Sequence, residues 1–477
     1  MSNHIPNDAD EESPLIRDEI LNPHSKSDSA HRDSTPEHVL PIALLASLAM
    51  ASTAATSYYA YATLLCRDPA HCRGDEKSRY AGTVAVAVSA ANVFGILALG
   101  HLQKLSVSNQ KLGLLLWMGT RSMSAVMLLL GVFFKSIFIA LSGRIFEGLA
   151  SDNLLHYVLN AIYSQTNDDR RTSTLIGSSM ALYLAGISIS PFVAGLFQNF
   201  TISFFIALGL FVFAIVYLQI FIPSRSGSTS RKPTSTEEAF SAAVPRNQDR
   251  DEPWRNLMRT ISSPLISFRQ HPKDLTFGLS LLAYNLVQSY MFSALLVHTS
   301  LQFNFTGREN GILISLAHSV AAVYLALALY ILPSVLRAWR SRSSNDARSS
   351  SKRTAVQKDA LLATLSQIIQ VLSLIGLGFA STAKQIYALT AFLALSLPAS
   401  SFIKGAFVAT CEGEEKTRGL AALAAMETVG SVLGPLVIGG WQSYSVAGPT
   451  VFFIAAGIAA FSMVLFCLGV VGKGTFR

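Results

Sequence analysis

Two ten-residue stretches decide the fold, GISISPFVAG at residues 186–195 and GSVLGPLVIG at residues 430–439. In each, a glycine is followed four positions later by a small residue, then directly by proline, and four positions further on by glycine. Proline removes a backbone hydrogen-bond donor and bends a helix, and glycine lets a neighbouring helix approach closely. The residues concerned are Gly186, Ser190, Pro191 and Gly195, and Gly430, Gly434, Pro435 and Gly439. Both stretches lie in long apolar segments, so their recurrence in the two halves of the chain predicts a duplicated membrane bundle.

The composition indicates the same class of protein. Of the 477 residues, 51% are hydrophobic and only 14% are charged, and the charges gather in runs between apolar stretches. A soluble protein of this length would mix them. The formal net charge of +8 comes from basic residues beside apolar segments, where they set topology and meet anionic lipid. We therefore expect a lipid bilayer as a partner and no nucleic acid.

Twelve segments are long and apolar enough to cross a hydrocarbon core of about 30 Å. They cover residues 39–65, 81–102, 112–134, 136–163, 173–198, 201–222, 275–300, 310–336, 359–381, 385–408, 419–443 and 447–471. The fold class that this predicts is an all-α membrane protein with two pseudo-symmetric bundles of six helices. The predicted parts are a disordered cytoplasmic tail (1–38), an N-terminal bundle (39–222), a cytoplasmic linker (223–274), a C-terminal bundle (275–471) and a second cytoplasmic tail (472–477).

Most lysines and arginines fall in the tails and in the loops that follow even-numbered spans. Because cytoplasmic loops carry the excess of these residues, both termini are predicted to be cytoplasmic. The expected location is the plasma membrane, with the vacuolar membrane as the alternative. The two glycosylation sequons, at Asn199 and Asn304, then fall in outside loops and predict a glycoprotein, with little modification of Asn199 so close to the membrane.

Two cysteines share the longest outside loop. Cys66 and Cys72 are six residues apart in an oxidising compartment, so they either form a local disulfide or remain two free thiols. Four cysteines in a chain of this length exclude a disulfide scaffold.

Ionisable residues inside apolar spans are costly, so they normally face a bundle interior or a cavity. On a helical wheel, Arg144 and Glu147 share one face of the fourth span with Asp152 on its shoulder, and Arg121 lies at mid-depth of the third. In one interpretation, an arginine attracts an anionic group while Glu147 or Asp152 exchanges a proton. In the other, Arg121 and Arg144 only neutralise these carboxylates as fixed ion pairs.

The second half offers two titratable candidates, His318 in the eighth span and Glu427 in the eleventh. His318 either titrates or bonds to a helix carbonyl. Glu427 has no arginine or lysine in its own span, which favours a proton-coupling role. Lys404 is expected to extend from the tenth span to the interface. Further substrate-binding candidates are the neutral polar residues Asn92, Asn285 and Gln288.

Motifs of several enzyme classes are missing from the sequence. It has no paired-histidine cluster for a metal, no Gly-x-Ser-x-Gly elbow and no HExxH. Residues 469–475 lack the glycine spacing of a phosphate-binding loop. We therefore predict a protein that is not an enzyme, has no metal or other cofactor, and draws its energy from a gradient.

The twelve spans, the long linker after the sixth and the stretch from Gly186 to Gly195 resemble the major facilitator superfamily of transporters. The last resembles that family's antiporter-type motif. Gly143-Arg144-Ile145-Phe146-Glu147-Gly148 is similar to its membrane arginine followed four residues later by glycine. The loop after the second span departs from the family pattern, because Lys104 stands where aspartate is usual. This departure puts the usual cytoplasmic gate in doubt.

The resemblance implies a secondary transporter of a small organic substrate, working as a monomer by alternating access, with protons as the coupling ion. Efflux of a metabolite or drug is favoured, because the fifth span resembles that of drug:proton antiporters and of fungal-type metabolite exporters. Proton-coupled import of an organic anion is the rival, which the membrane arginines suit. A protein of another class, a membrane sensor or scaffold with a transporter fold, is the second alternative.

Overall fold

The structure is a computed structural model that describes residues 36–69, 72–163, 169–197, 199–222, 268, 272–327, 331, 350–410, 415–445 and 448–472. The described residues all belong to one compact unit, Pro36–Arg477. The predicted tails at 1–38 and 472–477 and the predicted linker at 223–274 lie almost wholly outside them.

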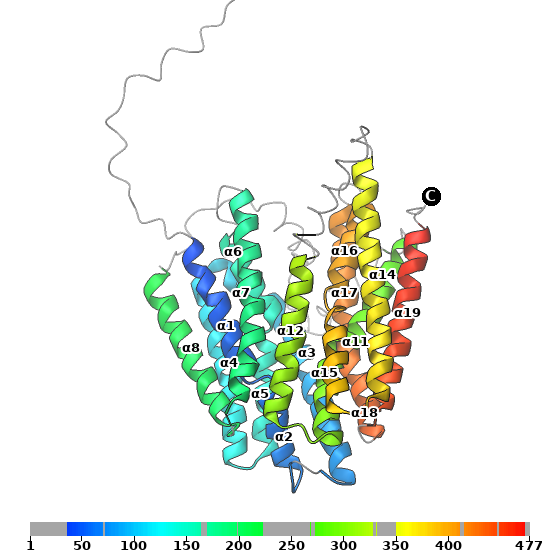
Figure 1. The fold of residues 1–477 in the computed structure, drawn as a ribbon. Coiled ribbons are helices and arrows are strands. Elements are labelled where there is room, and N and C mark those ends of the chain that lie inside the picture. Colours follow the sequence, from blue (N-terminus) through cyan, green and yellow to red (C-terminus); the bar gives the residue numbers. More distant parts are fainter. Residues whose placement is uncertain are drawn as a thin grey trace, which may run out of the picture. The chain divides into compact units, whose positions relative to one another are not determined.

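Every regular element of the described residues is a helix (Figure 1). In the first half these are a 3-10 turn (Pro36–Val39), α1 (Leu40–Ser52), α2 (Thr56–Leu65), α3 (Asp75–Ser108), α4 (Gln110–Phe133), α5 (Ile137–Leu149), α6 (Asp152–Tyr163), α7 (Asp169–Gly195) and α8 (Ile202–Phe221). In the second half they are α11 (Pro272–Gln302), α12 (Gly307–Ala326), α14 (Ser350–Phe379), α15 (Ala383–Ala394), α16 (Ala399–Thr410), α17 (Glu415–Gly434), a π-helical turn (Pro435–Gly439), α18 (Gly440–Tyr444) and α19 (Thr450–Gly472).

Eleven segments among the described residues are long and apolar enough to cross a membrane, one for each predicted span except the fourth. The prediction of one continuous helix over 136–163 is wrong, because this segment is broken into α5 and α6. Ala150 leaves the helical region with a ψ of 56°. The break frees backbone carbonyls, and the indole Nε1 of Trp117 donates to the Ser151 carbonyl at 2.9 Å.

The tenth span breaks at the equivalent place of the second half, between α15 and α16. Pro398 ends this interruption, since proline cannot donate to the preceding turn. The hydroxyl of Tyr284 donates to the carbonyls of Ser396 at 2.8 Å and Leu397 at 3.1 Å. In both halves, a buried aromatic side chain from a neighbouring helix donates to a backbone carbonyl at the break.

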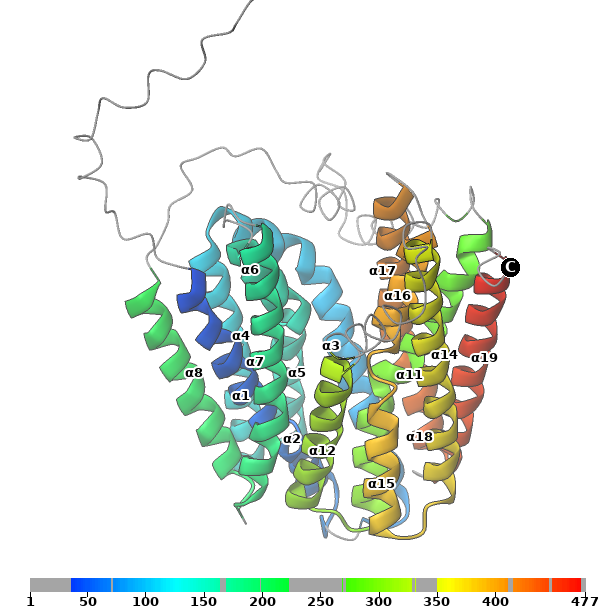
Figure 2. The same cartoon turned by 45° about the horizontal axis from the view of Figure 1, so that its top comes forward.

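Because consecutive spans run in opposite directions, the bundle has two sides. We call one the disulfide side, since Cys66 and Cys72 lie there, and the other the linker side, where α8 ends and α11 begins. Figures 1 and 2 show the first half in blue to green beside the second in yellow-green to red, with α3 and α12 where the halves meet.

The hydrophobic core differs between the two sides. On the disulfide side, one cluster of buried side chains contains residues of both halves, among them Tyr61, Tyr290 and Phe452. Towards the linker side there are two large separate clusters. One, with Trp117 and Phe211, contains only first-half residues, and the other, with Phe277 and Phe407, contains only second-half residues. The halves are therefore joined through a shared core on the disulfide side.

The two sequence stretches occupy equivalent positions in α7 and α17. A side chain at Gly186 would collide with Ser47 of α1, and one at Gly434 would collide with Ser289 and the Leu286 carbonyl of α11. The final glycines face the opposite half instead. A Cβ at Gly195 would lie 3.2 Å from the backbone of Arg308 in α12, and one at Gly439 would lie 2.5 Å from Ala85 in α3. Each stretch thus packs one helix within its half and also touches the other half.

Pro435 affects a hydrogen bond between the two halves. Its ring nitrogen cannot donate to the carbonyl of Ser431, four residues earlier. That carbonyl instead accepts a hydrogen bond of 2.8 Å from the side-chain amide of Asn92 on α3. The helix continues as a π-helical turn, Pro435–Gly439. Such wider turns occur inside α-helices where the regular pattern of backbone hydrogen bonds is interrupted. The second stretch is therefore tied to the first half by a carbonyl that proline frees.

Candidate functional site

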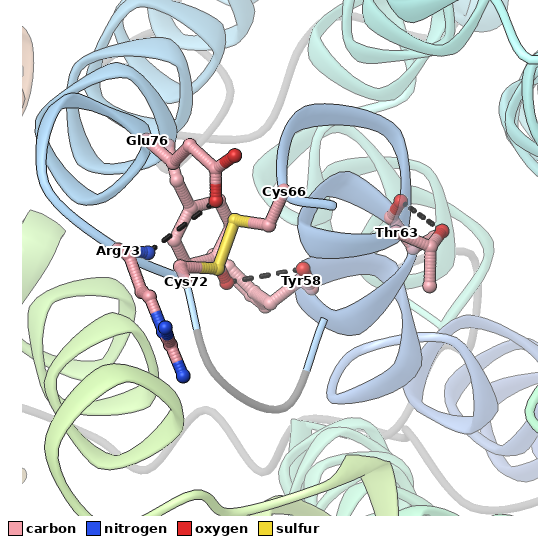
Figure 3. Close-up of a disulfide and its surroundings, with 8 residues drawn as sticks. Tyr58, Thr63, Cys66, Cys72, Arg73 and Glu76 are labelled. Carbon is pink, nitrogen blue, oxygen red and sulfur yellow. Dashed lines mark hydrogen bonds between the residues drawn. A yellow bond between two sulfur atoms is a disulfide. The ribbon is translucent and has the colours of Figure 1, made fainter. Parts of the chain in front are cut away.

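The functional site is built on α2, whose position the neighbouring α3 fixes. Cys66 follows α2, Cys72 precedes α3, and the two are bonded, with their Cα atoms 5.2 Å apart (Figure 3). Glu76 accepts from the backbone N–H of Arg73 at 3.3 Å, next to this bridge. Deeper in the bundle, the Tyr80 hydroxyl donates to the Tyr58 carbonyl at 3.0 Å. These contacts hold the tyrosines of α2 in place.

Arg144 on α5 is the centre of the site, and only 8% of its surface is exposed. Its Nε donates to the hydroxyl of Tyr61 at 2.9 Å, and its Nη1 donates to Oε2 of Glu147 at 2.7 Å. The guanidinium carbon lies 5.4 Å from the ring centres of both Tyr58 and Tyr61, within the range of a cation–π interaction. Its Nη2 is buried and has no hydrogen-bond partner among the described residues.

Glu147 is shared by two arginines. Its Oε1 lies 3.2 Å from Nη2 of Arg121 on α4, and its Oε2 binds Arg144. Arg121 also donates through Nη1 to the backbone carbonyl of Glu147 at 3.2 Å. This carbonyl lies one turn before the break between α5 and α6, so Arg121 both satisfies the broken helix and holds the carboxylate. One carboxylate thus faces two guanidinium groups.

These side chains line a cavity of about 280 Å³, at the lower end of the range for small-molecule sites. Its walls come from both halves. The residues that line it are Met50, Ala51, Thr53, Ala54, Ser57, Tyr58, Tyr61, Arg121, Ser124, Ala125, Leu128, Ala140, Gly143, Arg144, Glu147, Asp152, Ile187, Phe211, Phe292, Leu296, Ile314 and His318.

Two further predicted residues reach this cavity. Asp152, at the start of α6, lines the cavity and interacts with the hydroxyl of Tyr183 on α7. His318 enters from α12 in the other half. Its ring stacks on Phe292 with centres 5.6 Å apart, and its Nδ1 lies 2.9 Å from the Ile314 carbonyl. The structure therefore brings Arg121, Arg144, Glu147, Asp152 and His318 to one cavity.

The remaining candidates are not among the residues that line this cavity. Glu427 lies 2.5 Å from the ammonium of Lys404. Lys404, expected to extend to the interface, is thus the ion-pair partner of Glu427. Asn285 donates to the Glu427 backbone carbonyl at 3.2 Å, and Asn92 bonds to Ser431 as described above. Gln288 is half-buried on α11.

Among the aromatic residues of the site, Tyr58 is a cavity candidate from sequence, whereas Tyr61 and Phe292 were missed. Tyr61 and Phe292 lie in apolar segments of a chain that is rich in aromatic residues. Their residue types alone therefore do not indicate that they belong to a site. A signal was available for the tyrosines, because Tyr58 and Tyr61 are three residues apart and so share a helix face in the first span. The contact of the Tyr58 hydroxyl with Ser293 of α11, at 2.7 Å, had no sequence signal.

The described residues contain no group of three or more His, Cys, Asp or Glu side chains that could hold a metal ion. Cys467 is exposed as a free thiol, and both sequon asparagines are exposed. The ionisable side chains that line the cavity can take part in hydrogen bonding, charge interactions and proton exchange.

Comparisons with protein-family models and with curated proteins find no match. Solved structures do match over nearly the whole chain. The human organic anion transporter MFSD10 (TETRAN) is 14% identical, covers 91% of this chain and 99% of its own, and has a TM-score of 0.55. The nucleoside transporter NupG is 14% identical, with 93% and 100% covered and a TM-score of 0.60. The POT family transporter PepTSo is 13% identical, with 93% and 99% covered and a TM-score of 0.59.

All three of these proteins are membrane transporters. At this level of identity the likeness concerns the fold alone. The chain has the two-bundle, all-helical fold of transporters of the major facilitator type.

Proposed function

We propose that this chain, with its major-facilitator-type fold, is a secondary transporter that carries a small organic molecule by alternating access. The observation that supports this best is the cavity between the halves, which both halves line and which contains the Arg121–Glu147–Arg144 network. Substrate sites of such transporters lie near mid-membrane at the interface of their repeats. A charged site in the middle of the bundle has little use in a protein that only binds partners at its surface.

The arrangement of the cores supports a specific state in the transport cycle. The halves share a core on the disulfide side and have separate large cores towards the linker side. In this state the cavity is closed to the disulfide side. If both termini are cytoplasmic, as the basic loops predict, the outside is closed and the cytoplasmic side is the one from which solute enters or leaves.

Tyr58 connects the cavity to the contact between the two halves on the closed, disulfide side. Its ring lies under the guanidinium of Arg144, and its hydroxyl bonds to Ser293 of the other half at 2.7 Å. A solute that moves Arg144 therefore disturbs a contact between the halves. This coupling is what alternating access requires, because the ligand must bind the two states with different free energies.

For the coupling ion we propose protons, carried by Glu147. It is the carboxylate of the cavity that two arginines hold, and its protonation would release both of them. For the direction, the fifth-span stretch at Gly186 to Gly195 favours export, and the unpaired nitrogen of Arg144 favours uptake of an anion together with protons. The organic anion transporter MFSD10 agrees with the second alternative in substrate class.

The test is flux through the purified chain in sealed vesicles with an imposed pH gradient. Candidate solutes come from comparing metabolites inside and outside cells with and without the gene. We expect at least one of them to move only when the gradient is present and to stop moving in Glu147→Gln. If no solute moves while ligand binding is intact, a sensing or scaffolding protein is the better explanation.

A further inference from the structure

We propose that the substrate of this cavity is an organic anion with one negative charge, held by the guanidinium of Arg144, and that a proton on Glu147 accompanies it. The inference rests on the proposed transport function and names its substrate class. Its starting point is the buried Nη2, which lacks a hydrogen-bond partner in the part of the chain that the structure describes. A buried donor without an acceptor is costly, most of all on a charged group.

The other donors of Arg144 are used, which fixes the direction of the free one. Nε is bound to Tyr61 and Nη1 to Glu147, and Tyr58 and Tyr61 lie against the guanidinium. The group therefore cannot turn away without breaking two hydrogen bonds. A ligand in the cavity meets a guanidinium that is already oriented, and an anionic oxygen is the acceptor that a charged N–H donor binds most strongly.

The charges around Glu147 determine the charge of the ligand that binds together with a proton. Arg121 from α4 and Arg144 from α5 face its carboxylate, Asp152 from α6 lines the same cavity, and the tyrosines of α2 and His318 of α12 complete the surroundings. With His318 neutral, two positive and two negative charges balance. A bound anion adds one negative charge in a poorly solvated space, and one proton on Glu147 restores the balance.

At the two arginines a cation has no comparable place. Both oxygens of Glu147 are occupied by arginines, so a bound cation would have to displace one of them and would leave three positive charges against two negative. The walls argue for an organic molecule rather than a small inorganic ion, since Leu128, Phe292 and Ile314 line the cavity with apolar surface. The volume of about 280 Å³ is far larger than a water-sized site.

The probes for the test are matched pairs, a carboxylate and its uncharged amide: butyrate with butyramide, benzoate with benzamide, and indole-3-acetate with indole-3-acetamide. Benzylamine is the cationic probe. Binding to the full chain in lipid nanodiscs is measured calorimetrically at pH 5.5 and 7.5. We expect at least one carboxylate to bind about ten- to hundredfold more tightly than its amide. Its affinity should rise by up to about tenfold for each unit of pH lowered, because one proton is taken up.

The decisive variant gains affinity, so misfolding cannot imitate it. Glu147→Gln frees Nη1 of Arg144 and should bind the carboxylate at pH 7.5 as tightly as the parent does at pH 5.5, without further pH dependence. His318→Gln should keep the parent's pH dependence, which excludes the histidine as the proton carrier. Arg144→Gln should lose the preference for the carboxylate over its amide.

The proposal is overturned if amides or benzylamine bind as tightly as carboxylates, if no probe binds, or if Glu147→Gln keeps the parent's pH dependence. Flux separates this outcome from failure of the transport function. If a neutral or cationic solute moves into sealed vesicles, the transport function is supported and the anion as substrate is contradicted. If a carboxylate binds as expected but never crosses the membrane, the anion site is supported and the transport function is contradicted.

Discussion

The charged groups of the first half and those of the second are arranged for different tasks. In the first half, one carboxylate is held between two arginines beside a cavity, and Arg144 is 8% exposed with one nitrogen unpaired. In the second half, Glu427 and Lys404 form a simple pair whose side chains are 24% and 34% exposed. A pair with one charge of each sign is complete, whereas a cluster with a free donor still needs a ligand. Under the proposed function, this difference favours the charged groups of the first half, rather than those of the second, as the ones that meet the solute.

The largest effect is expected from removing the carboxylate of each of these two clusters. Glu147→Leu leaves two buried arginines without a counter-charge, so we expect the free energy of unfolding to fall by about 3–5 kcal/mol. Glu427→Leu leaves only Lys404, whose long side chain can turn to the linker side, so the loss should be about 1 kcal/mol. Thermal unfolding in the same lipid and detergent measures both. Equal losses would mean that the two clusters are alike.

The helix contacts of the two glycine stretches give the next test. Gly434→Leu and Gly186→Leu should block flux with expression largely kept, since overpacking a helix contact costs about 1–3 kcal/mol. Gly119→Leu is the matched control, because a side chain there meets nothing within 4 Å.

Alanine refines this test. At Gly434 it presses on the backbone carbonyl of Leu286, while at Gly186 the nearest atom is the movable hydroxyl of Ser47. Gly434→Ala should therefore reduce flux more than Gly186→Ala. The opposite order would show that the first-half contact is the stricter one.

The contact between Asn92 and Ser431 predicts a smaller and more specific effect. Asn92→Ala removes the donor to the Ser431 carbonyl and should destabilise the chain by about 1–3 kcal/mol. Pro435→Ala restores a backbone N–H that can take over this carbonyl, so the double variant should be more stable than Asn92→Ala alone. A double-mutant cycle by thermal unfolding measures the coupling. Strictly additive losses would refute this role of the proline.

The smallest effect is expected from the isosteric change of the second-half pair. Glu427→Gln keeps the shape of the side chain next to Lys404, and neither residue lines the cavity. Flux should fall less than about twofold, and its dependence on pH should stay that of the parent, in contrast to Glu147→Gln. A flux profile between pH 5.5 and 7.5 decides this. A flat profile in Glu427→Gln would move proton coupling to the second half.

The sequence predicted the fold class because apolar length and the repeated stretches are local properties of the chain. It also predicted five residues of the cavity, since ionisable groups such as Arg144 and His318 are rare in membrane spans. The partners could not be predicted, because they depend on which faces meet in space. Glu427 lacked a basic neighbour in its own span, yet Lys404 comes from another. The break in the fourth span also escaped, since no proline or glycine marks Ala150 and Ser151.

The carbonyl of Ser431 gives the opening of the interface a definite energetic cost. When the halves separate at α3 and α17, Asn92 moves away and the carbonyl loses its donor, because Pro435 has none to offer. Water entering the gap can replace that bond at little net cost, of the order of 1 kcal/mol, whereas a dry separation would cost several times as much. Under the proposed alternating access, hydration of this one acceptor contributes to the activation barrier of opening, and the rate of turnover should respond to conditions that withdraw water, such as high osmolyte concentration.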